Sequence, residues 1–156
     1  MSTHVVDAVP REARPYQGRR AGVVSRLAAN TVDFVVIALV VAGGYFGLCA
    51  VLFLWSPTAF TFPETSWTVL LIAAGAVAFV YLTVSWATTG RTYGDHLLGL
   101  RVLNFRGGRM QVAGAAARAA FCVVFPIGIL YALVSPANRS VQDVLLRSSV
   151  VYDWSR

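Results

Sequence analysis

Residues 32–55 read VDFVVIALVVAGGYFGLCAVLFLW, a long apolar run in which Asp33 is the single charged side chain. About 20 helical residues, rising ~1.5 Å each, cross the ~30 Å hydrocarbon core of a bilayer. The run is therefore long enough to cross a membrane with some tilt. The sequence predicts a transmembrane helix here, and the rest of the chain is interpreted from it.

A second apolar run covers residues 67–87, with Trp67 and Trp86 near its ends, where indole rings favour the headgroup region. Over the whole chain, 57% of the residues are hydrophobic and 13% are charged. Soluble domains carry about 25% charged residues. A chain of 156 residues cannot hide so much apolar surface in its own core, so we expect a lipid bilayer to surround both runs.

A third apolar segment, residues 119–135, is shorter and has Pro126 and Gly128 in its middle. As a straight helix it would be only about 25 Å long, and proline breaks or kinks a helix. It either crosses the bilayer or enters it and turns back. The predicted fold is thus an all-α membrane protein with two transmembrane helices and a third short, Pro-broken membrane segment, spanning or re-entrant.

The segment between the second and third apolar runs, residues 88–117, is rich in glycine and arginine. Within it, residues 97–105 alternate imperfectly between apolar and polar and are followed by RGGR at residues 106–109. This pattern indicates a strand and a turn, or an interfacial hairpin. Residues 149–152 favour another short strand. We therefore expect a small glycine-rich strand or hairpin region on the cytoplasmic side.

The distribution of arginine predicts the orientation, because an excess of basic residues marks the cytoplasmic side. The chain has no lysine; five arginines precede the first run, none lies in residues 56–66, and four lie in the glycine-rich segment. We expect a multi-pass protein of the plasma (inner) membrane with a cytoplasmic N-terminus. The segment after residue 135 lies outside if the third apolar segment crosses, and inside if it turns back.

Three units are expected along the chain. Residues 1–24 are polar, basic and interrupted by prolines, which is typical of a disordered tail. Residues 25–152 form the membrane domain, and residues 153–156 form the C-terminal end.

Asp33 is unusual because a carboxylate at the centre of a membrane helix costs about 2.5–3.5 kcal/mol on insertion scales. It lies near the cytoplasmic end and still needs a partner. Arg26 stands two helical turns earlier on the same face, and Arg118 and Asp143 are further candidates for one cluster. Such a cluster serves either as an ion or proton site or as a structural set of ion pairs that fixes the helix register.

Two glycine patterns stand out. Gly43 and Gly47 have the small-xxx-small spacing that lets a partner helix approach closely. The glycine-rich motif of the later segment contains Gly90, Thr92, Gly94 and Gly99. Its spacing matches neither standard phosphate-binding fingerprint, so we expect a tight turn at the membrane surface.

Other classes of function have little support. The sequence has no credible Ser/His/Asp or Cys/His arrangement and no metal-ligand spacing. We therefore expect no enzymatic activity, no cofactor and no metal. The arginines flank apolar runs instead of forming a basic stripe on a polar fold, so we expect no binding of nucleic acid.

Several motifs together resemble the RDD family of small integral membrane proteins. They are Arg26-x-x-Ala29-x-x-x-Asp33, Gly90-Arg91-Thr92-Tyr93-Gly94, Leu98-Gly99-Leu100-Arg101-Val102, Arg118 and Arg139-Ser140-Val141-Gln142-Asp143. The resemblance covers about residues 22–152. Asp95 stands where the family usually has a basic residue, Gln142 where it usually has His, and Arg147-Ser148 where a Gly-Thr pair is usual.

The resemblance implies two functions. RDD-like proteins in actinobacteria accompany lipid importers, and the Arg-only composition is compatible with such a source. The first hypothesis is an accessory subunit of a larger envelope complex, for example a lipid-import system, with membrane-protein partners or a homo-oligomer. The second is a small oligomeric cation/proton antiporter that uses Asp33 and Asp143. We favour the first slightly, because two or three membrane segments are too few to enclose a polar path alone.

Overall fold

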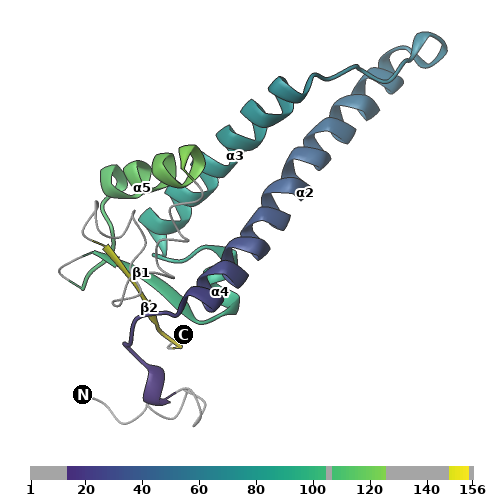
Figure 1. Ribbon diagram of the computed structural model, residues 1–156. Helices are drawn as coiled ribbons and strands as arrows, with labels where there is room; N and C mark the ends of the chain where they lie inside the picture. Colours follow the sequence, from purple (N-terminus) through teal and green to yellow (C-terminus); the bar gives the residue numbers. More distant parts are fainter. Residues whose placement is uncertain (1–13, 105–106, 126–147, 155–156) are drawn as a thin grey trace.

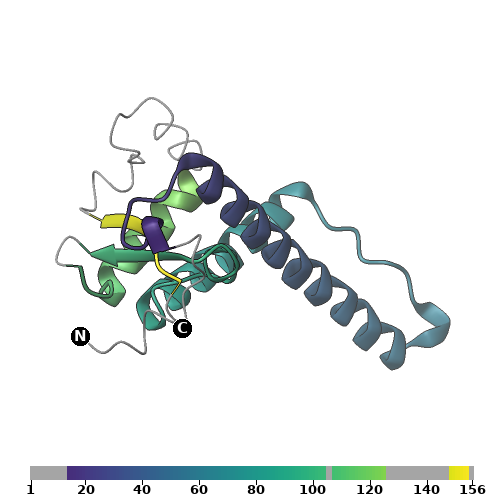
Figure 2. The same cartoon turned by 90° about the horizontal axis from the view of Figure 1, so that it is seen from below.

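A computed structural model describes residues 14–104, 107–125 and 148–154 of the chain (Figure 1). Its helices are η1 (Arg14–Tyr16), α2 (Val23–Trp55), η2 (Pro57–Ala59), α3 (Trp67–Thr88), α4 (Tyr93–Leu97) and α5 (Val112–Val124). Its strands are β1 (Leu100–Asn104) and β2 (Ser148–Tyr152). Two long helices project together; α4, α5 and the two strands gather around the end where α2 begins and α3 finishes, and η2 lies at the opposite end (Figures 1 and 2).

The two long helices confirm the two predicted spans. Both α2 and α3 are long and apolar enough to cross a bilayer. Only 6% of the most apolar window of α2, and 0% of that of α3, is buried inside the molecule. These helices are therefore not the buried core of a soluble domain, and their exposed apolar surface requires lipid or a partner.

The first helix begins at Val23, earlier than the predicted start at residue 32. The predicted apolar run left out these first turns because they carry polar residues such as Arg26 and Asn30. The structure instead buries Arg26 and Ala29, with 4% and 1% of their surfaces exposed. Tertiary contacts at this end replace the lipid that surrounds the rest of α2, so the polar side chains are compatible with a continuous helix.

Part of the predicted disordered tail is ordered, which corrects the domain boundary at residue 24. Arg20 forms an isolated antiparallel bridge with Val151. Ala21 is fully buried, and its N–H donates to the Val150 carbonyl at 2.9 Å. The segment just before α2 therefore continues the edge of the sheet. Residues 1–13 lie outside the described part of the chain.

The sheet has two antiparallel strands, β1 and β2, that lie far apart in the sequence. Their register runs from Leu100 opposite Tyr152 to Asn104 opposite Ser148. Strand β1 lies inside the predicted segment 97–105, but its partner is not the next piece of chain. The alternative of a local hairpin was therefore wrong, and the sheet joins the middle of the chain to its last described residues.

The predicted C-terminal end also belongs to this sheet region. The N–H of Asp153 donates to the Gly99 carbonyl at 2.7 Å. Its carboxylate pairs with the guanidinium groups of Arg91 and Arg101, each at 2.8 Å. A boundary at residue 152 would separate these partners, so the described residues 153 and 154 are part of the same domain.

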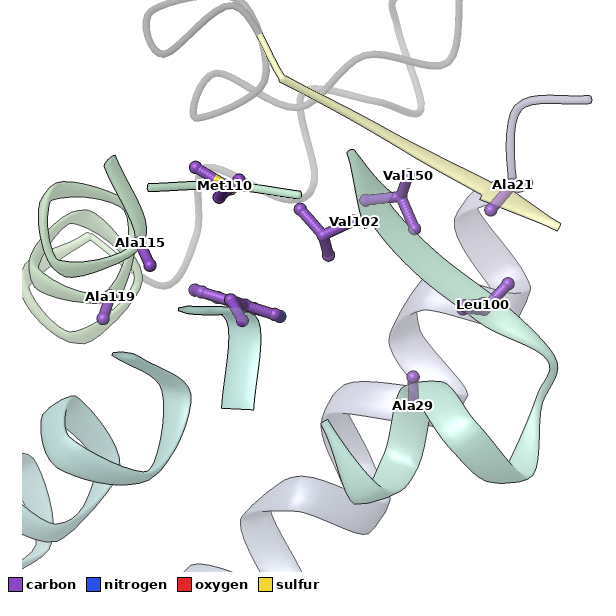
Figure 3. Close-up of a cluster of buried hydrophobic side chains, with 9 residues drawn as sticks. Ala21, Ala29, Leu100, Val102, Met110, Ala115, Ala119 and Val150 are labelled. Atoms are coloured by element: carbon purple, nitrogen blue, oxygen red, sulfur yellow. The ribbon is translucent and has the colours of Figure 1, made fainter. Parts of the chain in front are cut away.

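A small apolar core lies between the sheet, the start of α2 and helix α5 (Figure 3). Its buried members are Ala21, Ala29, Trp86, Leu100, Val102, Met110, Ala115, Ala119 and Val150. Trp86 corrects an expectation, because only 6% of its surface is exposed and it is a core residue rather than a headgroup anchor. Trp67, with 82% exposed at the start of α3, remains free to take that role.

The helix α5 overlaps the third apolar segment only in part. It begins at Val112, before the predicted start at residue 119, and it packs against α3. With 13 residues it is about 20 Å long, too short to cross a ~30 Å core. Residues 126–135 lie outside the described part of the chain, so whether the segment crosses or turns back stays a prediction.

Candidate functional site

The carboxylate of Asp33 connects three elements of the fold. Its Oδ1 accepts hydrogen bonds from the Tyr81 hydroxyl of α3 and from the Gly94 N–H of α4, each at 2.8 Å. Its Oδ2 accepts one from the Thr92 hydroxyl at 2.6 Å. Asp33 is 5% exposed. Three donors to one buried carboxylate satisfy most of its acceptor sites and tie α2 to its neighbours.

A second carboxylate lies on the other side of Thr92. Thr92 is the N-cap of α4, where its hydroxyl accepts from the Asp95 N–H at 3.0 Å. The Asp95 carboxylate in turn accepts from the Thr92 N–H at 3.2 Å, completing a capping box. It also accepts from the Trp86 indole N–H at 3.3 Å. Thr92 therefore bridges the two buried acidic residues.

Burial raises the pKa of the Asp95 carboxyl above 3.8, its ordinary value. The negative charge of Asp33 raises that pKa further, while the hydrogen bonds from the Thr92 N–H and the Trp86 indole lower it. Burial is the largest of these effects. The short helix α4 thus holds an acidic side chain whose protonated form is favoured more than in water.

The raised pKa predicts a dependence of stability on pH. Because the folded state binds the Asp95 proton more tightly than the unfolded state, this contribution is full below pH 3.8 and declines as pH rises through the raised pKa. We expect Asp95→Asn to weaken this decline, since its amide oxygen still accepts from Thr92 and Trp86. Melting of the detergent-purified protein across a pH series measures it. Equal pH profiles for both proteins would contradict the prediction.

The glycine-rich motif is explained by close approach and by backbone conformation. A Cβ at Gly94 would overlap the carbonyl oxygen of Ala29, so α4 lies directly against α2. Gly90 and Gly99 have φ angles of +74° and +63°, the left-handed region that favours glycine. A Cβ at Gly99 would also overlap the ring of Trp154. These residues shape the chain around Thr92, and α4 is too short to offer a phosphate site.

Two arginines reach the same region from opposite sides. Arg26 of α2 and Arg118 of α5 are 4% and 5% exposed. A terminal nitrogen of Arg118, Nη1, donates to the Ser148 hydroxyl at 2.5 Å, and its guanidinium carbon lies 5.1 Å from the centre of the Trp86 ring. That distance suits a cation–π contact. Both charges are held inside the structure instead of extending to a lipid headgroup region.

A cavity of about 600 Å³ connects these groups. Its polar lining residues are Arg26, Asn30, Asp33, Asp95 and Arg118, together with the indole of Trp86. Its apolar lining residues include Phe34, Ile37, Leu71, Ala74, Ala78, Leu82 and Val123. The polar group lies where α2 begins and α3 ends, and the apolar group continues along these two helices. The cavity is therefore polar at one end and apolar at the other.

The sequence model of the RDD family matches residues 20–147, which is well over half of the chain. The chain belongs to the RDD family. This confirms the resemblance inferred from the motifs and supports a membrane protein with two apolar helices. No curated protein and no solved structure matches the chain significantly.

The structure brings together three of the four residues predicted to form the RDD-type cluster. Arg26, Asp33 and Arg118 line one cavity, whereas Asp143 lies outside the described part of the chain. Arg26 and Asp33 were predicted to share one face of the helix two turns apart, and the donors that contact the Asp33 carboxylate come from α3 and from the region of α4. The observed partners are a tyrosine, a threonine and a backbone amide.

The predicted helix-packing pair of this RDD chain, Gly43 and Gly47, does not line the cavity. Gly43 and Gly47 are exposed on the half of α2 away from the sheet, and among the described residues no other part of the chain comes within 4 Å of a Cβ built there. Within the described residues, neither glycine brings α2 close to another helix. The surface they form is open to lipid or to another molecule.

Two site residues were missed by sequence reasoning. Tyr81 lies in an apolar helix, where a single hydroxyl gives no periodic signal. Trp86 occupies a helix end, where a headgroup role is the usual interpretation. A comparison of membrane depth could have found the pairing of Asp33 with the Tyr81 hydroxyl. It would ask which polar side chain of the second predicted span lies at the same distance from the membrane surface as Asp33.

Proposed function

We propose that this RDD-family chain is an accessory membrane subunit that packs against a larger envelope complex of the plasma membrane, for example a lipid-import system. The observation that carries the proposal is the set of three hydrogen bonds to Asp33. Because donors from α3 and from the region of α4 bind its carboxylate, Asp33 holds α2 against these two helices. On this proposal the chain works by assembly, without an enzymatic step, cofactor or metal.

The exposed apolar surface of the spans supports a partner. Large side chains on both helices have most of their surface open, including Phe46 at 63%, Leu54 at 77% and Leu71 at 71%. The Gly43 and Gly47 surface adds a place where another helix can approach closely. Two described spans with few mutual contacts leave broad faces for a partner helix or a second copy.

The proposed orientation has a cytoplasmic N-terminus, as the arginine distribution predicts. Helices α4 and α5 and the sheet then lie on the cytoplasmic side, and the loop between α2 and α3, with η2, lies outside. This arrangement puts the two described buried arginines of the cavity at the cytoplasmic interface.

Crosslinking tests the proposal. A photoactivated crosslinking residue replaces Gly47 in the full chain. Membranes that contain this variant are illuminated, and the protein is then extracted in mild detergent. A Gly47→Ala variant without the photoactive residue controls for background. We expect a reproducible crosslinked species of defined mass, either to a larger membrane protein or to a second copy. A solitary monomer under all conditions would argue strongly against an accessory subunit.

The cation/proton antiporter that uses Asp33 and Asp143 remains a second candidate. Asp33 lines the cavity together with Asp95, and Asp143 lies outside the described part of the chain. Reconstituted vesicles should then show ion-dependent proton movement that Asp33→Asn abolishes. Unchanged flux in that variant would exclude Asp33 as the carrier. The three donors to Asp33 favour the structural role over this one.

A further inference from the structure

Helix α5 carries its charge on the inside and its apolar side chains on the outside. Its sequence, VAGAAARAAFCVV, contains a single charged residue, Arg118, which is 5% exposed and lies beside Trp86 of α3. Every exposed residue of α5 is apolar, and Val112, Phe121 and Val124 have 66%, 37% and 82% of their surfaces open. A helix that borders water has the opposite arrangement, with charged residues outside and apolar residues inside. The outer face of α5 is therefore suited to an apolar surrounding.

Two contacts give the depth of α5 along α3. Just before α5, the Arg109 guanidinium donates to the carbonyl of Thr88, the last residue of α3, at 3.2 Å. Near the end of α5, the Val123 side chain lies 3.5 Å from a Cβ built at Gly75. Gly75 lies 13 residues before Thr88, which corresponds to about 20 Å along the helix axis. The chain thus enters beside the end of α3 and reaches the level of its central turns (Figure 1).

At this depth α3 itself is open to lipid. It is long and apolar enough to cross a bilayer, and 0% of its most apolar window is buried. Leu71 and Ile72, which lie about one turn from Gly75, are 71% and 67% exposed. Because α5 packs against α3, the hydrocarbon that surrounds α3 at the level of Gly75 also meets the end of α5. The outer face of α5 is continuous with the lipid-facing surface of the span.

We propose that α5 is embedded in one leaflet of the bilayer, where its outer face contacts lipid acyl chains and Arg118 is turned away from them. This outer face consists of Ala113, Ala117, Ala120, Phe121 and Val124. The leaflet is the one that adjoins the sheet, because a helix of 13 residues, about 20 Å long, does not reach across a ~30 Å core. An arginine on the outer face would be costly at this depth.

The proposal goes beyond the accessory role and does not depend on it. It assigns the outer face of α5 to lipid, so a partner subunit docks on another surface, such as that of Gly43 and Gly47. A protein without any partner would still insert α5 into the leaflet.

Spin labels test the proposal on the full chain in phosphatidylcholine liposomes. Cys49 and Cys122, the two cysteines of the chain, are replaced by alanine, and single labels are attached to Ala117→Cys or Val124→Cys. Oxygen concentrates in hydrocarbon, whereas a polar nickel chelate stays in water, so relaxation by each reagent reports the surroundings of a label. We expect both labels to respond to oxygen and not to nickel, and the label at residue 124 to lie deeper.

Two reference labels make the result decisive. Leu71→Cys reports hydrocarbon, because Leu71 is exposed on α3. Gly108→Cys reports water, because Gly108 is exposed in the turn before α5 and a Cβ there meets no described residue within 4 Å. The label at residue 124 should match that at residue 71. Nickel access equal to that at residue 108 would overturn the proposal. Exclusion of both reagents would also overturn it, since protein would then cover the face, either residues 126–147 or a second chain.

A pair of charge substitutions tests the depth without labels. Val124→Asp removes little internal contact, because Val124 is 82% exposed, but it places a carboxylate in hydrocarbon. It should shift the balance between inserted and uninserted protein about 100-fold. Val112→Asp, at the shallow end of α5, should cause a much smaller loss from the membrane fraction. Equal effects of the two substitutions, whether small or large, would overturn the proposal, and this comparison decides the question even if the labelled proteins do not fold.

Discussion

Asp33→Asn is expected to remove most of the folded protein from the membrane fraction. The asparagine keeps one acceptor oxygen, whereas three donors from Tyr81, Thr92 and Gly94 face the native carboxylate. Its amide NH₂ would point at a donor, and each buried group left unsatisfied costs about 1–3 kcal/mol. That is a large part of a typical stability of about 5–15 kcal/mol. Abundance of a fluorescent fusion and the melting temperature in detergent measure the effect.

A graded control accompanies this variant. Tyr81→Phe removes a single donor to Asp33 and should cause a smaller loss, because two donors remain. Thr31→Ala, at an exposed position of α2 two residues before Asp33, should have little effect. The abundance of Asp33→Asn could be unchanged while the ion tolerance of the cells falls. That result would mean that folding does not need the hydrogen bonds of Asp33, and it would favour the transport hypothesis.

Gly94→Ala should prevent α4 from docking on α2. The added methyl group would overlap the backbone carbonyl of Ala29, and a backbone cannot rotate away as a flexible side chain can. Overpacking typically costs about 1–3 kcal/mol and sometimes more. Here separation of the helices also lengthens the Gly94 hydrogen bond to Asp33. We expect a marked fall in melting temperature and faster proteolysis of the loop after α3.

The matched control for this change is Gly44→Ala. Gly44 lies in the middle of α2, and within the part of the chain that the structure describes nothing comes within 4 Å of a Cβ built there. Alanine also favours a helix over glycine by about 1 kcal/mol. Its melting temperature should therefore stay the same or rise. A fall of similar size in both variants would mean that α4 does not depend on close contact at residue 94.

The spans could be predicted because their signal is local. A run such as residues 32–55 needs only length and hydropathy, and both are visible without knowledge of neighbours. The true start at Val23 could not be seen in this way, because the burial of the polar Arg26 depends on tertiary structure that a local pattern does not show. The pairing of β1 with β2 is equally hidden, since it joins segments more than 40 residues apart that have helix α5 between them.

The site was predictable in its charges and not in its partners. Arg26, Asp33 and Arg118 stand out because charged side chains are costly near a membrane, and the structure collects all three at one cavity. The hydrogen-bond donors to Asp33 come from a tyrosine, a threonine and a peptide N–H, which are ordinary groups at any position in a sequence. Their role depends on the depth and rotation of each helix, which composition does not encode.

The pairing of β2 with both β1 and Arg20 bears on how the protein is made. The ribosome delivers the two spans to the translocation machinery before it has synthesised β2, so membrane insertion precedes completion of the sheet. Until then Leu100 and Val102 have no opposite strand to cover their backbone edge. Biogenesis thus has two separable stages, and a nascent chain arrested before residue 148 should be inserted in the bilayer yet remain a substrate for chaperones and quality-control proteases.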